Sequence, residues 1–260
     1  MRAVHTGPMI GLTALLALLA ALARAVGLGG HGWAVGIACG VIASAALARG
    51  LARHGVNRLG PAGRVTLTRA VLAGGVAALT ADSFGRPAPV TALVALAVLV
   101  LVLDCVDGWI ARRTRTASAF GARFDLEVDA FLILVLSVYV ARSTGAWVLA
   151  IGVARYAFVA AGWQLRWLRA PAPPRHWCKV VAATQGIVLT VAAADAAPRD
   201  LTVAALVVSL AVLTESFGRE VCWLWRLRGF EPGRFVISRL GGELGAELDG
   251  ELLGEQVRAG

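Results

Sequence analysis

Four aspartates lie close together in a chain with few acidic residues. They are Asp104, Asp107, Asp125 and Asp129, half of the chain's eight aspartates. At about 100° of rotation per residue, the first two share one face of a helix, and the last two share one face of the next helix. The short connection around residues 113–116 predicts that these helices are antiparallel neighbours. We therefore expect the four carboxylates to converge.

Carboxylates held this close repel one another, and two divalent cations would cancel their four charges. Hard oxygen ligands without His or Cys suit Mg²⁺, Mn²⁺ or Ca²⁺ rather than zinc. A pair of such ions can stabilise in-line displacement at phosphorus. The spacing therefore indicates a metal-dependent phosphoryl-transfer site. The alternative is a set of solvated charges at helix ends, which is the interpretation we favour for Glu127, on the far side of its helix from Asp125 and Asp129.

The elements that carry these residues are those of a polytopic membrane protein. The 260 residues are 58% hydrophobic and 16% charged, with a mean hydropathy of +0.73. A soluble domain is about 45–50% apolar and about 25% charged. The net charge of +9 comes from 24 arginines and one lysine that lie between long apolar runs, so it indicates membrane orientation rather than nucleic-acid binding. The four scattered cysteines support neither a zinc site nor a disulfide framework.

Eight apolar runs predict an all-α bundle of about eight transmembrane helices, because helices satisfy their own backbone in lipid. The runs cover residues 10–23, 32–48, 65–81, 87–103, 117–141, 143–165, 180–194 and 201–214.

Charge between the runs predicts the orientation. Segments 49–64, 112–123 and 166–179 each carry four Lys or Arg, whereas the alternate connections carry one Arg each. This asymmetry places both termini and the aspartates on the cytoplasmic side of a cell (inner) membrane. The first run also resembles a signal peptide, and its cleavage would leave this orientation unchanged.

The pattern D-x2-D-G-x2-A-R-x8-G-x3-D-x3-D, in residues 104–129, resembles the signature of the CDP-alcohol phosphotransferases, integral-membrane enzymes of phospholipid synthesis. All eight fixed positions match. The resemblance implies a six-helix catalytic domain at residues 60–228 and two additional helices within residues 1–59. It also implies a homodimer. The composition of residues 229–260 predicts an acidic, Gly-rich cytoplasmic tail.

The resemblance further implies transfer of a phosphoalcohol group from a CDP-alcohol to an acceptor hydroxyl, with release of CMP. Asp104, Asp107 and Asp125 would be ligands of two Mg²⁺ or Mn²⁺ ions, and Asp129 a ligand or the catalytic base. The remaining fixed positions would serve the nucleotide: small residues would leave room for it and an arginine would pair with its diphosphate. These are Gly108, Ala111, Arg112 and Gly121.

Two further stretches resemble segments of the same family. Residues 60–70 match its first core helix at Thr66 and Arg69, which we assign to nucleotide binding; for Arg69 the alternative is an anchor at the membrane interface. Residues 175–186 match a segment that opens the fifth core helix at Lys179 and Gln185. Val181 and Ala182 replace a Lys and a Thr of that pattern.

Three basic residues are candidates for binding the acceptor or its phosphate. They are Arg155, Arg175 and Lys179. Arg155 lies deep within an otherwise uncharged run, and an ion pair with Glu215 or another helix carboxylate is its alternative. We expect CDP-diacylglycerol as the donor, and these cations favour a polar alcohol, with or without a phosphate, as the acceptor.

Two other functions remain open from the residues. A membrane prenyltransferase also holds Mg²⁺-diphosphate with aspartates on facing helices, although its motifs lie on distant helices. A cation-coupled transporter would place the acidic cluster near the midplane between inverted repeats, and we find no such repeat.

Overall fold

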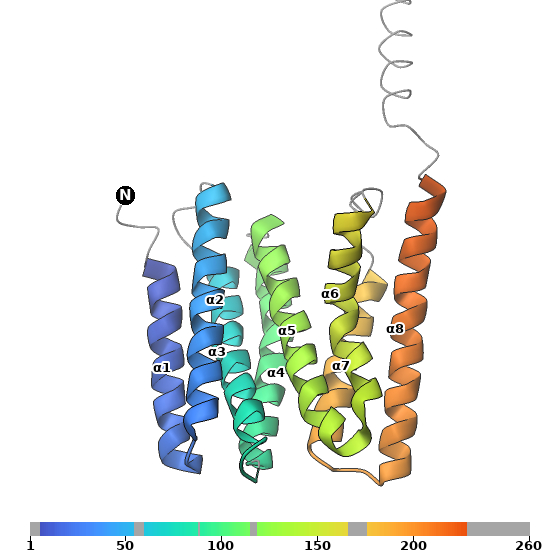
Figure 1. Cartoon of the computed structure of the whole chain (residues 1–260). Helices are drawn as coiled ribbons and strands as arrows, with labels where there is room; N and C mark the ends of the chain where they lie inside the picture. Colours follow the sequence, from blue (N-terminus) through green and yellow to red (C-terminus); the bar gives the residue numbers. More distant parts are fainter. Residues whose placement is uncertain (1–5, 55–59, 88, 115–118, 166–175, 228–260) are drawn as a thin grey trace, which may run out of the picture. The chain divides into compact units, whose positions relative to one another are not determined.

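A computed structural model of the chain consists of helices joined by short connections (Figure 1). It describes residues 6–54, 60–87, 89–114, 119–165 and 176–227. The elements are α1 (Thr6–Val26), α2 (Gly30–His54), α3 (Pro61–Asp82), α4 (Val90–Thr114), α5 (Ala119–Thr144), the short 3₁₀ helix η1 (Ala146–Val148), α6 (Leu149–Gln164), α7 (His176–Ala193) and α8 (Arg199–Leu227). No strand occurs in these ranges, which confirms the all-α prediction. The tail at 229–260 lies outside the described residues.

The eight α-helices correspond to the eight apolar runs, but they differ in how well they suit a membrane. Within the described ranges, five segments are long and apolar enough to cross one: Gly7–Val26, Gly30–Arg53, Gly63–Asp82, Ala146–Gln164 and Arg199–Arg226. The apolar parts of α4 and α7 are shorter, Val90–Val106 and Lys179–Ala193. Charged residues interrupt α4, α5 and α7 near one end, and these three helices carry the candidate site.

The chain divides into two compact units. The first unit contains the candidate site, and Gly218 belongs to the second. The first unit contains residues 1–160 and 174–216, and the second contains residues 161–173 and 217–260. In the second unit, the described residues form the last turn of α6 and the C-terminal part of α8.

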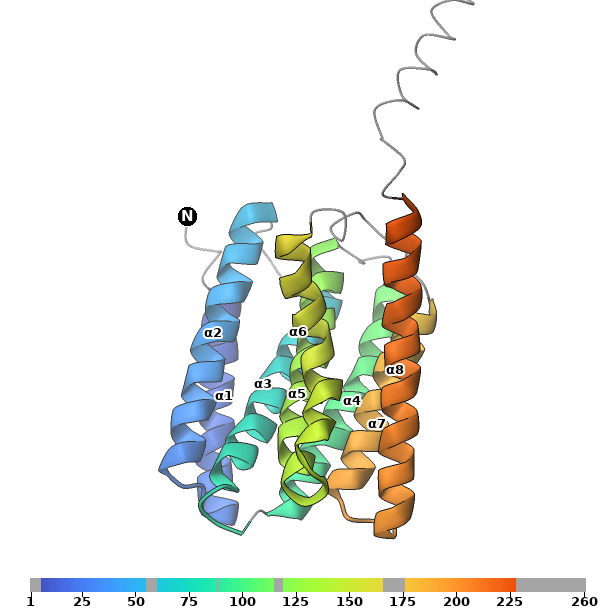
Figure 2. The ribbon, with the colours of Figure 1, turned by 45° about the vertical axis from the view of Figure 1, so that its right-hand side comes forward.

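Helix α3 is the centre of the first unit and packs against α1, α2, α4 and α5 (Figure 2). Its middle is a run of small or medium apolar residues that are almost fully buried, from Ala73 to Leu79. Small side chains allow helices to approach closely in lipid, where dispersion rather than water exclusion favours association. At Gly32 of α2, an added Cβ would lie 2.9 Å from the carbonyl oxygen of Ala78 in α3.

Local sequence explains where the helices around the site begin and end. Helix α3 starts with Pro61 directly after its N-cap Gly60, a position where the missing N–H of proline costs nothing. Its last residue, Asp82, is buried and accepts a hydrogen bond of 3.0 Å from the backbone N–H of Gly29, which ties it to the connection before α2. Helix α5 ends before Gly145, whose φ of 116° suits glycine.

The sequence predicts that the two aspartate-bearing helices are antiparallel neighbours, and among the described residues α4 and α5 make little direct contact with each other. Instead, α3 packs against both α4 and α5 on one side, and α7 packs against both on the other. The space between α4 and α5 is therefore held open by two other helices. A local sequence pattern could not have predicted this, because it contains no information about α7.

We predict that Gly152→Ala destabilises the protein, because α6 approaches α5 at backbone distance there. An added Cβ would lie 2.7 Å from Cα of Leu134 and 2.9 Å from Oγ of Ser137. Overpacking of this kind costs about 1–3 kcal/mol. Gly218→Ala is the control, since a Cβ at Gly218 meets no atom within 4 Å, and alanine favours a helix by about 1 kcal/mol. Thermal unfolding in detergent micelles should rank Gly152→Ala below wild type and Gly218→Ala at or above it; the reverse order would contradict the packing.

Candidate active site

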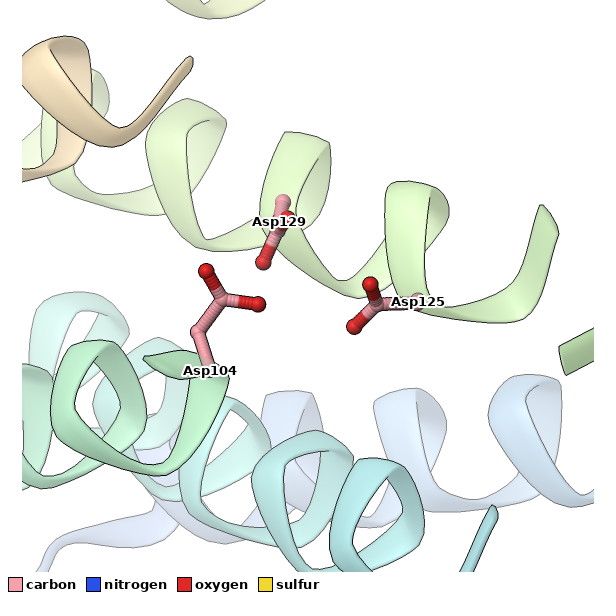
Figure 3. Close-up of side chains that lie close together, drawn as sticks. All are labelled: Asp104, Asp125 and Asp129. Atoms are coloured by element: carbon pink, nitrogen blue, oxygen red, sulfur yellow. The ribbon is translucent and has the colours of Figure 1, made fainter. Parts of the chain in front are cut away.

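Three of the four predicted aspartates come together in the space between α4 and α5. Asp104 extends from α4, and Asp125 and Asp129 extend from successive turns of α5, with their carboxylates directed toward one another (Figure 3). One oxygen from each lies within 4.8 Å of the other two. The predicted convergence is thus confirmed for these three. Helix α4 includes Asp107, but its side chain lies outside the described residues.

A buried arginine from the third helix contacts all three carboxylates. Nη1 of Arg69 lies 2.9 Å from Oδ1 of Asp104 and also pairs with Oδ1 of Asp125, while Nη2 pairs with Oδ1 of Asp129. The Arg69 side chain is 0% exposed, whereas those of Asp104, Asp125 and Asp129 are 34%, 29% and 25% exposed. This burial does not fit the interfacial-anchor alternative for Arg69.

The exposed sides of the carboxylates line a pocket of about 390 Å³. Its walls come from three helices. Helix α4 contributes Leu101, Asp104, Cys105 and Gly108; α5 contributes Ala122, Asp125, Leu126, Asp129, Leu132 and Ile133; and α7 contributes Lys179, Ala182, Ala183 and Gly186. The pocket therefore joins three carboxylates and one ammonium group to a largely apolar wall.

The donor set of the pocket fits hard divalent cations. Oxygen ligands from carboxylates are what Mg²⁺ and Mn²⁺ prefer. Three carboxylates face one buried guanidinium, which leaves an excess of negative charge beside the pocket. Among the described residues that line the pocket, the one cation is Lys179, which is exposed. Asp104, Asp125 and Asp129 can thus hold a cation from the pocket side.

Of the other residues predicted to bind the nucleotide, the structure describes Gly108, Gly121 and Thr66. Gly108 lines the pocket, and Gly121 is half-buried in the first turn of α5. Thr66 is buried on α3 one turn before Arg69. The side chains of Ala111 and Arg112 lie outside the described residues. Their assignment to the nucleotide stays a prediction.

Of the three candidate acceptor-binding residues, one lines the pocket. Lys179 does so, and Arg175 lies outside the described residues. Arg155 instead pairs with Glu127, at 2.5 Å between Nη2 and Oε1. The structure therefore shows the alternative that the sequence left open, an ion pair with a helix carboxylate, but with Glu127 rather than Glu215 as the partner. An acceptor-binding role for Arg155 stays a prediction.

Glu127 lies on a different face of α5 from the aspartates. With Phe124, Val128 and Phe131 it lines a separate, mostly apolar hollow of about 200 Å³ that also includes residues of α2, α3 and α6. This agrees with the helical rotation that set Glu127 apart from Asp125 and Asp129.

Sequence reasoning did not assign to the pocket the small residues of α7 that complete its wall, and it noted Ala182 only as a departure from the family pattern. Ala182, Ala183 and Gly186 follow Lys179 at intervals of three, four and seven residues, which is the repeat of one helix face. Starting from Lys179, that repeat could have identified them. Gln185, a match to the family pattern, lies on the buried face, where its Nε2 donates to the Ser209 carbonyl oxygen (2.9 Å) and its Oε1 accepts from Ser209 Oγ (2.5 Å).

Comparison with known proteins gives one informative match. A family model described as CDP-alcohol phosphatidyltransferase matches residues 59–215, more than half of the chain. The matched region begins before α3 and ends within α8, so it includes every described residue of the pocket. No curated protein and no solved structure gave a significant match.

We predict that Asp129→Asn weakens Mn²⁺ binding at least about tenfold, the low end of the range for losing even a partner of a metal ligand, because it removes one charge from the three described carboxylates. Glu127→Gln is the matched control: it is two residues away and acidic, but it faces the other hollow. The Mn²⁺ affinity of both variants can be measured by titrating purified protein with Mn²⁺ and monitoring free Mn²⁺ by electron paramagnetic resonance. Equal loss of affinity in the two variants would contradict the site.

Proposed function

Because the chain belongs to the CDP-alcohol phosphatidyltransferase family, we propose that it transfers a phosphatidyl or other phosphoalcohol group from a CDP-alcohol to an alcohol acceptor and releases CMP. The observation that carries this proposal is the pocket that Asp104, Asp125, Asp129 and Lys179 line together. It combines a cation-binding set with a positive group suited to a phosphate. No observation of the described residues favours a prenyltransferase or a transporter.

In the proposed reaction the acceptor oxygen forms a bond to the phosphorus that carries the lipid alcohol. The bond from that phosphorus to the bridging oxygen breaks, and CMP leaves with the bonding electrons. Two Mg²⁺ or Mn²⁺ ions, when bound, supply positive charge that neutralises the diphosphate and the leaving group. Asp104, Asp107 and Asp125 would hold them.

Asp129 has either of two roles in this proposal. It accepts the proton of the acceptor hydroxyl at a carboxylate oxygen, or it completes the ligand set. Asp129 is the least exposed of the three described carboxylates, at 25%, and it lies next to Leu132 and Ile133 on the pocket wall. A covalent intermediate is not required, because phosphoryl transfer depends mainly on positioning and charge neutralisation.

The remaining parts of the proposal concern substrates and location. We favour CDP-diacylglycerol as the donor, since its acyl chains suit a membrane-embedded enzyme with an apolar pocket wall. Both termini and the pocket face the cytoplasm of a cell membrane, which is supported by the Arg-rich connections that follow α2, α4 and α6. Residues 60–228 form the catalytic domain after two additional helices, and the homodimer that the resemblance implies stays a prediction.

The proposed reaction predicts metal-dependent release of CMP. Purified protein should release CMP from labelled CDP-diacylglycerol when a suitable alcohol or alcohol phosphate is added, and EDTA should abolish the release until Mg²⁺ or Mn²⁺ is restored. Asp129→Asn should lose at least about 10²-fold in rate, the lower range for removal of a general base. If no alcohol or alcohol phosphate in a panel of acceptors caused CMP release from either CDP-diacylglycerol or soluble CDP-alcohols, the proposed function would be refuted.

A second prediction identifies the class of acceptor. If the acceptor carries a phosphate, Lys179→Met should raise the KM of the acceptor about tenfold, because the variant loses a charge-assisted hydrogen bond to that phosphate. This is the low end of the range for such a loss, since Lys179 is exposed to solvent, which screens its charge. The KM of the CDP-alcohol and kcat should change much less. If Lys179→Met changed the KM of phosphorylated and unphosphorylated alcohols equally, Lys179 would not be a phosphate ligand.

A further inference from the structure

A single guanidinium joins three helices at the candidate site. Arg69 belongs to α3, while its partners belong to α4 (Asp104) and α5 (Asp125 and Asp129). Both terminal nitrogens of Arg69 take part, and these three contacts are made to Oδ1 of the respective carboxylate. The planar fork of arginine suits this arrangement, because its donors point in fixed, divergent directions.

The guanidinium and the pocket lie on different sides of the carboxylates. Arg69 is 0% exposed and is not among the described residues that line the pocket, whereas its three partners line it and are 25–34% exposed. A carboxylate offers about four lone-pair sites on two oxygens. A cation that arrives from the pocket therefore has carboxylate oxygens to bind without displacing Arg69.

We propose that Arg69 is a positioning residue that stays behind the carboxylates and keeps them assembled for the cation, rather than a contact to the nucleotide. This inference rests on the proposed function for the identity of the ligand, but the arrangement itself is present without any ligand. Without such a partner, three carboxylates whose oxygens lie within 4.8 Å would repel one another and separate.

Two effects of Arg69 on cation affinity oppose each other. Its positive charge repels a cation, and its contacts hold the ligands in place. A substitution that removes the charge changes both effects and gives an ambiguous result. Arg69→Lys keeps the charge but replaces the fork with a single ammonium group, so it tests positioning alone.

The first experiment measures Mn²⁺ affinity of the full-length protein by electron paramagnetic resonance. We expect Arg69→Lys to weaken Mn²⁺ binding about 10–100-fold, the range seen when the partner of a metal ligand is lost. Arg142→Lys is the matched control, because Arg142 contacts Ser83 and Phe84 at the other end of α5 and should leave the affinity unchanged. Unchanged or tighter binding by Arg69→Lys would overturn the proposal.

The second experiment needs no metal and uses thermal unfolding in EDTA. In wild type, Asp129→Asn removes a partner of Arg69 and should not raise Tm. In an Arg69→Gln background the same change relieves repulsion and should raise Tm by a measurable amount. If Asp129→Asn changed Tm equally in the wild-type and Arg69→Gln backgrounds, Arg69 would not hold the carboxylates together. Because EDTA is present, this result does not depend on metal binding.

Failure of the inference and failure of the proposed function give different results. If wild type binds no Mn²⁺ and releases no CMP, the function fails, and the unfolding series in EDTA still decides the role of Arg69. If wild type binds Mn²⁺ and releases CMP while Arg69→Lys binds Mn²⁺ as tightly, only the positioning role is lost.

Discussion

The contact of one arginine with three aspartates determines how the rest of the site is arranged. A charged side chain in the middle of a membrane helix costs about 2.5–3.5 kcal/mol or more unless it is paired. Asp104, Asp125 and Asp129 share Arg69 as their buried partner, which allows their oxygens to lie within 4.8 Å. One positive charge does not balance three negative ones, and the excess faces the pocket, where a divalent cation can complete the neutralisation.

This arrangement explains why the helices differ in apolar length. Helices α4, α5 and α7 line the pocket, and their charged residues interrupt the apolar segments that lipid favours. Helices α1, α2 and α8 contribute no described lining residue and have full-length apolar spans. Helix α3 combines both properties: it is long and apolar enough to span, and the Arg69 that it contributes to the site is completely enclosed by protein. The helices that line the pocket therefore depend on their neighbours for stability in the membrane.

The sequence predicted the helices and most of the aspartate cluster, because both depend on short-range patterns. A spacing of four residues places Asp125 and Asp129 on one face of α5 whatever surrounds it. The partners of charged residues were harder to predict. Arg69 and Asp129 are 60 positions apart, and Arg155 and Glu127 are 28 apart, so their pairing depends on which helices pack together. The separation of α4 and α5 by α3 and α7 was equally hard to predict, because it also depends on which helices pack together.

Helix α7 shows which departures from the family pattern affect chemistry. Val181 and Gln185 lie on its buried face, and the hydrogen bonds of Gln185 to Ser209 attach α7 to α8. In a membrane, such buried polar pairs fix the position of a helix. Val181 therefore replaces a family lysine at a position directed away from the pocket, whereas Ala182 replaces a threonine on the pocket wall. Only the second departure removes a polar group from the pocket wall, because the side chain of Val181 is buried in the helix packing.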